Sequence, residues 1–343
     1  MHRRLVVSAR PARRLIPCLA SLWLIAWLAP AHAAEPPAWP TTETAAEQAG
    51  RIPLWPGDGL APGDRALTQP QRTLERSTDP ALPDRFVDHV NRPYLVVQRP
   101  AHPNGAALLV IPGGGYARIV LDKEGSALVP SFVEQGGVTL FVLRYRLPGE
   151  GHADGADAPL ADAQRALRLI RARANEWGVD PHRIGVMGFS AGGHLAASLG
   201  TRYDETLHAA RDAIDRVPAR PDFQLLVYPV IDMTGIATHA GSRQQLLGDA
   251  PQADRMQQYS PQRHVTAATP PTFLVHAQDD TVVPVENSLL FYGALRAAGI
   301  PAEMHLFPRG GHGFGIRGTA GLTAAAWPRL ALAWIDAQRE VSP

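Results

Sequence analysis

Cysteine is nearly absent from this 343-residue chain, since the single one, Cys18, lies in the apolar N-terminal stretch. Without that stretch, the chain can form no disulfide, no thiolate metal site and no cysteine nucleophile. The sequence also lacks a His-Glu-x-x-His motif, which would indicate a catalytic zinc. It has neither an internal repeat of fixed period nor coiled-coil heptads. We therefore predict no metal, no cofactor and no repeat architecture.

The chain also has no large excess of positive or negative charge. The chain has 33 basic and 32 acidic residues, a formal net charge of +1. Five arginines precede the first acidic residue, Glu35, so loss of the N-terminal stretch leaves 28 basic residues and a formal charge of −4. Nucleic-acid binding needs a basic surface that neutralises phosphates. The charge balance therefore argues against a nucleic-acid partner.

The N-terminal stretch has the order of a secretory signal peptide. Basic residues come first, an apolar run of about residues 15–28 follows, and Ala-His-Ala ends at Ala33. An uncleaved anchor is the alternative, but the run is shorter than the roughly 20 residues that span a bilayer, and it contains Pro17. We predict a signal peptide over residues 1–33, export to the periplasm or the extracellular space, and no stable membrane association after cleavage.

A proline-rich segment follows the signal peptide. Residues 34–90 include "IPLWPGDGLAPGD" and show no sustained periodicity, which predicts an extended arm packed on a domain. Regular structure is expected from "PYLVVQRP" onward, so that residues 91–343 form the main domain. Residues 232–268 interrupt its pattern and could form a small lid or a surface excursion.

Within the main domain, apolar runs typical of buried strands alternate with stretches of helical composition. The strand-like runs are "AALLVIP", "GVTLFVLRY", "RIGVMGF", "FQLLVYPV", "TFLVHAQ" and "AEMHLFP", and the helix-like ones are residues 126–135, 160–177, 191–199, 285–298 and 323–338. Strands this apolar are covered on both faces. We predict an α/β fold with a mostly parallel central sheet, helices on both faces, and ligands at the carboxyl ends of the strands.

The stretch "IGVMGFSAGGHLAAS" joins one of these strands to a helix. Ser190 lies between Gly188 and Gly192, in the Gly-x-Ser-x-Gly pattern of a nucleophile elbow. The glycines allow a sharp turn that exposes the serine hydroxyl above the sheet. A glycine-rich turn without a catalytic role is the alternative, so the hypothesis requires partners for the serine.

A serine nucleophile needs an imidazole base that a carboxylate orients. Asp279 and Asp280 follow the strand "TFLVHA", and His312 follows the next strand in "PRGGHGFG". This is the chain order Ser, Asp, His of α/β hydrolases. Spacing alone does not separate the two aspartates. Among the other histidines, His194 is predicted to pack under the elbow and His276 to be a core residue.

The stretch "LLVIPGGGY" contains three glycines, residues 113–115, directly after a strand. Their backbone amides could turn toward one point and stabilise an oxyanion. The amide of Ala191, directly after the serine, would complete such an oxyanion hole. A flexible turn is the alternative for these glycines.

Taken together, the motifs resemble those of the α/β-hydrolase superfamily and, within it, the secreted carbohydrate and feruloyl esterases grouped as BD-FAE. The resemblance runs from residue 52 to the C-terminus through "IPLWPG", "IPGGGY", "GVDPHRIGVMGFSAGGHLAAS", "PPTFLVHAQDDTVVPVENS" and "GGHGFG". It implies the α/β-hydrolase fold and a catalytic triad. The triad acid of the family is the first residue of Asp-x-Val-Val-Pro, which selects Asp280 beside Ser190 and His312.

The resemblance also implies that Gly114 and Gly115 donate their amides to the oxyanion. Pro112 stands where the lipase-like branch has a histidine, which argues against that branch. The implied function is a serine esterase that removes acetyl groups from plant cell-wall polysaccharides or oligosaccharides such as xylan or xyloglucan. Its partner would be an acylated carbohydrate or another small ester.

Other functions remain to be compared with this one. A feruloyl esterase and a general short-chain carboxylesterase would use the same triad. A prolyl-oligopeptidase-type peptidase usually carries a large propeller domain, whereas only a short arm precedes the first predicted strand here. A non-catalytic carbohydrate-binding protein would be favoured if a triad residue were missing, and none is. No pair of carboxylates indicates a glycosidase.

Overall fold

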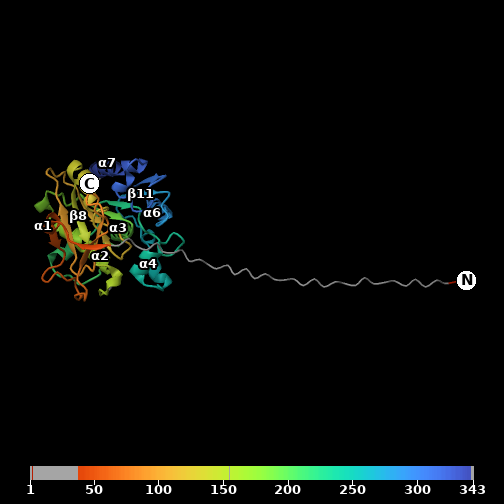
Figure 1. Ribbon diagram of the computed structural model, residues 1–343, viewed down its shortest axis with the longest axis horizontal. Helices are drawn as coiled ribbons and strands as arrows, with labels where there is room; N and C mark the ends of the chain where they lie inside the picture. The colour runs from red at the N-terminus through yellow and green to blue at the C-terminus, as the bar shows by residue number, and fades with distance from the viewer. Residues whose placement is uncertain (1, 3–37, 154, 341–343) are drawn as a thin grey trace. The chain divides into compact units, whose positions relative to one another are not determined.

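The computed structural model describes residue 2 and residues 38–153 and 155–340. Apart from residue 2, the predicted signal peptide lies outside the described residues. One unit of the fold comprises Pro37–Pro343 (Figure 1). Nowhere in the described ranges does a helix have the length and apolar character needed to cross a bilayer.

Eight strands form the central sheet, in the order β12-β11-β10-β9-β6-β8-β5-β2. Neighbours run parallel from β12 to β8, whereas β5 and β2 each pair antiparallel with the strand before them in this order. The strands are β2 (Arg51–Pro53), β5 (Tyr94–Gln98), β6 (Ala107–Ile111), β8 (Thr139–Arg144), β9 (Ile184–Phe189), β10 (Gln224–Val227), β11 (Thr272–Ala277) and β12 (Ala302–Phe307). The prediction of a mostly parallel sheet is confirmed.

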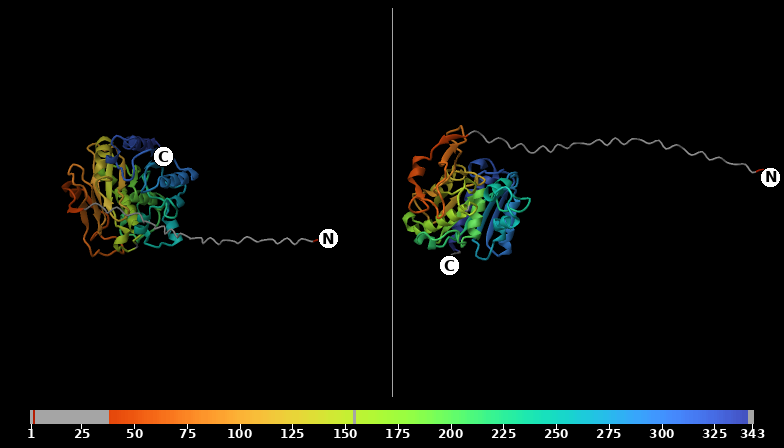
Figure 2. Two further views of the ribbon diagram at one scale, coloured as in Figure 1. Left: turned by 45° about the vertical axis from the view of Figure 1, so that its right-hand side comes forward. Right: turned by 90° about the horizontal axis from the view of Figure 1, so that it is seen from below.

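Helices cover both faces of this sheet (Figures 1 and 2). The α-helices of the main domain are α2 (Ala158–Ala172), α3 (Ala191–Thr201), α4 (Ala240–Leu247), α5 (Ala253–Gln258), α6 (Glu286–Ala297) and α7 (Trp327–Ala337). The 3-10 helices are η1 (Ser126–Leu128), η3 (Pro148–Glu150), η4 (Ala174–Trp177), η5 (Ala213–Arg216), η6 (Pro261–Arg263), η7 (Arg317–Thr319), η8 (Thr323–Ala326) and η9 (Gln338–Glu340), and η2 (Val129–Gln135) is a π-helix.

Alternation along the strands divides the apolar side chains between two cores. Leu109 of β6 packs in one core with residues of α2, α3 and α6. Its neighbour Leu108 packs in the other core with residues of η2 and α7. Successive side chains of a strand point to opposite faces. A strand such as β6, which is buried on both faces, therefore needs apolar residues at every position. This requirement explains the uninterrupted apolar runs in the sequence.

The segment before Tyr94 is more regular than the sequence indicates. It contributes β2 to the edge of the central sheet, the short helix α1 (Ala45–Ala49), and three strands of a second, antiparallel sheet. That sheet has the order β1-β3-β4-β7, formed by β1 (Trp39–Thr41), β3 (Arg72–Glu75), β4 (Arg85–Asp88) and β7 (Ile119–Val120). The expectation that regular structure starts at "PYLVVQRP" is therefore wrong. Strands of three or four residues are too short to produce a recognisable period.

Residues 232–268 connect β10 to β11 and contain α4, α5 and η6. The predicted insertion thus contains short helices over slightly less than half of its length. Its function as a lid stays a prediction.

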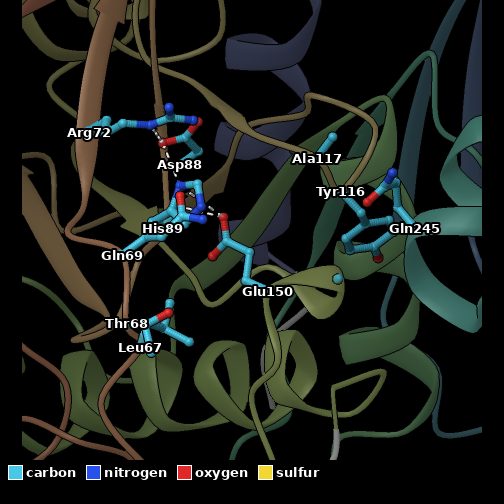
Figure 3. Close-up of a pocket in the computed structure, with 11 residues that line it drawn as sticks. Leu67, Thr68, Gln69, Arg72, Asp88, His89, Tyr116, Ala117, Glu150 and Gln245 are labelled. Atoms are coloured by element: carbon cyan, nitrogen blue, oxygen red, sulfur yellow. Dashed lines mark hydrogen bonds and ion pairs between the residues drawn. The ribbon is translucent and has the colours of Figure 1, made fainter.

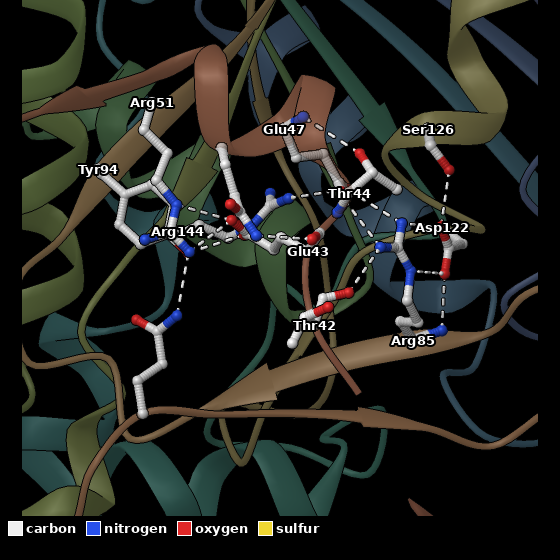
Figure 4. A network of polar contacts seen from close by, with 12 residues as sticks. Thr42, Glu43, Thr44, Glu47, Arg51, Arg85, Tyr94, Asp122, Ser126 and Arg144 are labelled. Carbon is white, nitrogen blue, oxygen red and sulfur yellow. Dashed lines mark hydrogen bonds and ion pairs between the residues drawn. The ribbon is translucent and has the colours of Figure 1, made fainter. Parts of the chain in front are cut away.

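Buried ion pairs attach α1 to the second sheet (Figure 4). The guanidinium of Arg85 on β4 donates hydrogen bonds of 2.8 and 3.1 Å to the carboxylate of Glu47 on α1. It also donates bonds of 3.0 and 2.8 Å to Asp122. Burial would raise the pKa of both carboxyls, but the hydrogen bonds and charge of Arg85 outweigh it and hold each pKa below its usual value. Both acids are therefore ionised near neutral pH.

We expect Arg85→Ala to lower the free energy of unfolding by about 3–5 kcal/mol, because it leaves two buried carboxylates unpaired. Urea denaturation followed by circular dichroism measures this change. Arg173→Ala is the control, since Arg173 forms an exposed ion pair with Glu176 and its loss should have little effect. Equal destabilisation by the two variants would contradict the importance of the buried network.

The network also has a pH dependence of known sign. The pKa values of Glu47 and Asp122 are lower in the folded than in the unfolded chain. The contribution of the two carboxylates to the free energy of unfolding is therefore complete above the ordinary carboxyl pKa of about 4. It is lost as the pH falls toward the folded-state values.

Candidate active site

Ser190 occupies a sharp turn between β9 and α3. Its backbone φ of 53° lies in the left-handed region, which non-glycine residues adopt only when the surroundings impose it. A Cβ atom at Gly188 would lie 2.2 Å from the carbonyl oxygen of Gly192, and one at Gly192 would lie 2.1 Å from that of Ile111. Only glycine fits at either position. Gly188 therefore lets the end of β9 approach α3, and Gly192 lets α3 start directly against the end of β6, as the elbow pattern predicts.

The structure brings the three predicted partners together. The Oγ atom of Ser190 lies 2.8 Å from Nε2 of His312, and Nδ1 of His312 lies 2.7 Å from Oδ2 of Asp280. Asp280 follows β11 and His312 follows β12, so both reach the serine from the carboxyl ends of neighbouring parallel strands. The result is one hydrogen-bonded chain from hydroxyl to carboxylate.

The environment of Asp280 keeps it ionised. Its Oδ1 atom accepts hydrogen bonds of 2.9 Å from the amides of Val282 and Val283. Burial would raise the pKa of this carboxyl, but hydrogen bonds from His276 and His312 hold the pKa well below its usual value. An ionised carboxylate only accepts, so Nδ1 of His312 carries a proton and Nε2 is free to accept one from Ser190.

The two neighbouring aspartates have separate positions. Asp279 does not contact His312; its Oδ1 accepts hydrogen bonds of 2.9 and 2.8 Å from the amides of Gly310 and Gly311. Asp279 thus holds the backbone of the loop after β12 that carries His312 (the histidine loop), and Asp280 holds the ring of His312. Sequence spacing did not show which of the two aspartates is the triad acid, whereas the family resemblance selected Asp280, the residue that contacts His312.

The other two histidines singled out in the sequence are buried and hydrogen-bonded. His194, on α3, contacts the hydroxyl of Tyr116 and the carbonyl of Tyr259 at 2.7 Å each, and burial lowers its pKa to about 4. His276 contacts Ser288 at 2.8 Å and approaches Oδ2 of Asp280 at 3.3 Å. The core positions predicted for both are confirmed, and His276 additionally supports Asp280.

The loop of residues 113–115 that follows β6, called the glycine loop below, lies against Ser190. A Cβ atom at Gly113 would come within 2.9 Å of the Ser190 Cβ, so only glycine allows this approach. Gly114 and Gly115 follow with φ values of 132° and 67°. Ala191 is the first residue of α3, where backbone amides have no partner within the helix. The arrangement fits an oxyanion hole formed by the amides of Gly114, Gly115 and Ala191, whose role stays a prediction.

Glu124 is a component of the site that the sequence did not reveal. Its carboxylate is buried and accepts a hydrogen bond of 2.6 Å from the Gly113 amide and one of 3.0 Å from the hydroxyl of Tyr228. The same hydroxyl accepts from the Gly315 amide, and the Tyr228 ring packs edge-on against His312. Burial raises the pKa of Glu124. One buried carboxyl thus links the glycine loop to the histidine loop.

Across residues 38–153 and 155–340, no three histidine, aspartate or glutamate side chains are grouped as metal ligands would be. The chemistry of the site is instead that of a nucleophile, a base and an orienting carboxylate. That the reaction needs no cofactor stays a prediction.

The fold and the strand-end position of this site define an α/β hydrolase. Residues 81–295 match the BD-FAE family, and the chain belongs to that family. A solved structure with this fold, the acetyl ester-xyloside bifunctional hydrolase from Caldicellulosiruptor lactoaceticus, is 36% identical with a TM-score of 0.67. The match covers 84% of this chain and 95% of that one.

Two further relatives are longer proteins. Endo-1,4-beta-xylanase B of Butyrivibrio fibrisolvens is 39% identical over 209 residues, which are 61% of this chain and 32% of that protein. The acetylxylan esterase of Xylanibacter ruminicola is 36% identical over 226 residues, which are 65% of this chain and 44% of that protein. The chain thus spans less than half the length of these two relatives.

We expect Asp280→Asn to lower kcat for a small ester such as p-nitrophenyl acetate by roughly 10⁴-fold, because the amide no longer fixes the His312 tautomer. Asp279→Asn, the neighbouring control, should cost far less, since an amide oxygen still accepts from Gly310 and Gly311. Steady-state kinetics on both variants shows which of the two aspartates orients His312. Similar losses in the two would contradict the assignment of Asp280.

Glu124→Ala should lower kcat with little change in KM, because the glycine loop loses its anchor. We expect a smaller effect than the roughly 100- to 1,000-fold loss found when an oxyanion donor itself is removed. Glu124→Gln keeps one oxygen to accept from the Gly113 amide and should retain more activity. Kinetics combined with thermal unfolding tests this, and a lowered melting temperature with unchanged kcat would show a purely structural role.

Proposed function

We propose that the protein is a serine esterase that removes acetyl groups from xylan or a related cell-wall polysaccharide. The hydrogen-bonded chain from Ser190 through His312 to Asp280 carries the proposal. This arrangement supplies a nucleophile and a general base in the correct tautomer, which is what acyl transfer requires. Its position at the carboxyl ends of the strands leaves the serine within reach of a substrate.

In the proposed reaction, Ser190 Oγ attacks the ester carbonyl while Nε2 of His312 takes the hydroxyl proton. The amides of Gly114, Gly115 and Ala191 stabilise the negative oxygen of the tetrahedral intermediate. When the intermediate collapses, His312 gives its proton to the departing sugar oxygen and the acetyl group stays on Ser190. A water molecule, deprotonated by His312, then attacks the acetyl-serine. As the bond to Ser190 Oγ breaks, His312 returns the proton to Oγ, and the acetic acid that leaves ionises to acetate.

The activities named for three similar proteins support the choice of acyl group and substrate. They are an acetylxylan esterase, an acetyl ester-xyloside bifunctional hydrolase and an endo-1,4-beta-xylanase. All three names refer to xylose-containing substrates, two of them to xylan, and two of the three refer to acetyl esters. A feruloyl esterase or a general short-chain carboxylesterase would use the same triad and differ only in substrate.

Export of the protein is part of the proposal. The N-terminal sequence has the basic, apolar and Ala-His-Ala order of a cleaved signal peptide. A polysaccharide substrate lies outside the cytoplasm, or reaches the periplasm as fragments, so export would bring enzyme and substrate together.

The function is tested by measuring free acid released from acetylated xylan, acetylated xyloglucan, acetylated pectin and a feruloylated oligosaccharide. We expect acetate from acetylated xylan, and a loss of roughly 10⁴-fold or more in Ser190→Ala. Ser198→Ala is the matched control, because Ser198 lies buried on the same helix, α3, and is not part of the triad. Activity on small synthetic esters alone would leave a general carboxylesterase, and an active Ser190→Ala variant would refute the mechanism.

A further inference from the structure

A cavity of about 380 Å³ opens beside the glycine loop (Figure 3). Tyr116 and Ala117, which directly follow Gly115, form one wall of it. The remaining walls come from residues 67–69, from Arg72 and Asp88 of the second sheet, from His89 directly after β4, from residues 149–150, and from Gln245 on α4. Ligand pockets have volumes of about 300–1,000 Å³, so the cavity is large enough to hold a small ligand.

Backbone strain marks this cavity as part of the functional region. Among the residues that the structure describes, four non-glycine residues have φ in the left-handed region. Two of them, Ser190 and Tyr228, belong to the site around His312. The other two, His89 with φ of 54° and Tyr116 with φ of 62°, both line the cavity. Strained residues of this kind cluster where a site is held in a set geometry.

The charged groups of the cavity are engaged with one another. Both carboxylate oxygens of Asp88 accept hydrogen bonds from Arg72, at 3.0 and 2.6 Å, and one also contacts the His89 ring at 2.9 Å. One oxygen of Glu150 accepts from the His89 amide at 2.6 Å, and the other is buried, 3.9 Å from His152. Arg72, the one arginine in the lining, is already paired with Asp88, so the cavity offers no free guanidinium to a ligand that carries a carboxylate.

The groups with spare hydrogen-bonding capacity are neutral. Within the described part of the chain, the side chains of Thr68, Gln69 and Gln245 make no hydrogen bond, and all three are exposed at the cavity. Figure 3 shows Gln69 and Gln245 on opposite sides of it. Each amide offers both donors and an acceptor, which matches hydroxyl groups, since these also donate and accept.

We propose that this cavity binds a neutral sugar unit of the acylated polysaccharide and so positions its ester at Ser190, an inference that rests on the proposed esterase function. Gln69 and Gln245 bind the sugar hydroxyls from the two sides. Asp88 and Glu150 do not act as a glycosidase pair in this proposal. Both oxygens of Asp88 accept hydrogen bonds from Arg72, and the Oε2 atom of Glu150, although it has no hydrogen-bond partner, is buried out of reach of a ligand. The sugar is bound here and not hydrolysed.

The kinetic test compares acetylated xylo-oligosaccharides with p-nitrophenyl acetate, which lacks the sugar. Gln69→Ala and Gln245→Ala should each lower the ratio of kcat/KM for the oligosaccharide to that for the small ester by about three- to tenfold, through KM, as expected for one lost hydrogen bond. Gln257→Ala is the matched control, since Gln257 is an exposed residue of α5 away from the cavity. Ratios equal to that of the wild type in both cavity variants would overturn the proposal.

A binding test separates this proposal from the esterase function. Calorimetry measures the affinity of unacetylated xylohexaose for Ser190→Ala, alone and combined with Gln69→Ala and Gln245→Ala. Weaker binding in the triple variant supports the cavity even if the wild type releases no acetate, which would refute only the esterase function. Acetate release together with absent or unaltered xylohexaose binding would refute only the cavity. Release of xylose, or tighter binding of a glucuronate-substituted oligosaccharide, would also overturn it.

Discussion

The close packing of backbone against backbone at the serine turn is the constraint on which the site depends. Gly188 brings the end of β9 into contact with the first turn of α3, and Gly192 brings that turn into contact with the end of β6; any larger residue would collide at either position. This contact sets the nucleophile next to Gly113 and the glycine loop. The loops that carry Asp280 and His312 meet Ser190 at this turn, because β11 and β12 end at the same edge of the parallel sheet.

Buried carboxylates hold the loops around this turn in place. Asp280 is fixed by two backbone amides and two imidazoles, and Glu124 joins the glycine loop to Tyr228 near His312. A buried carboxylate is costly unless every oxygen is hydrogen-bonded, so each of these groups selects one arrangement of its neighbours. The same principle applies to Arg85, which joins α1 to the second sheet. The rigidity of the site therefore comes from satisfied polar groups as much as from apolar packing.

The cavity beside the glycine loop connects the N-terminal segment to the chemistry. Residues 67–69, Arg72 and His89 lie before the first predicted strand, yet they line the space next to Tyr116. The segment that reads as a proline-rich arm thus supplies one wall of the proposed sugar site. Gln245 supplies another from the helical insertion. The two least regular parts of the sequence meet where substrate selection is proposed.

Local patterns in the sequence were sufficient to predict the alternation of strands and helices, the serine turn, and the chain order of Ser190, an aspartate after the strand "TFLVHA", and His312. These features follow from local patterns, namely uninterrupted apolar strands, obligatory glycines and polar residues directly after strands. Three features became apparent only in the folded chain: how the short strands before Tyr94 pair, that Asp279 binds backbone amides while Asp280 binds the His312 ring, and that Glu124 supports the glycine loop. Those features arise from contacts between segments distant in the chain, which leave no periodic or spacing pattern in any one segment.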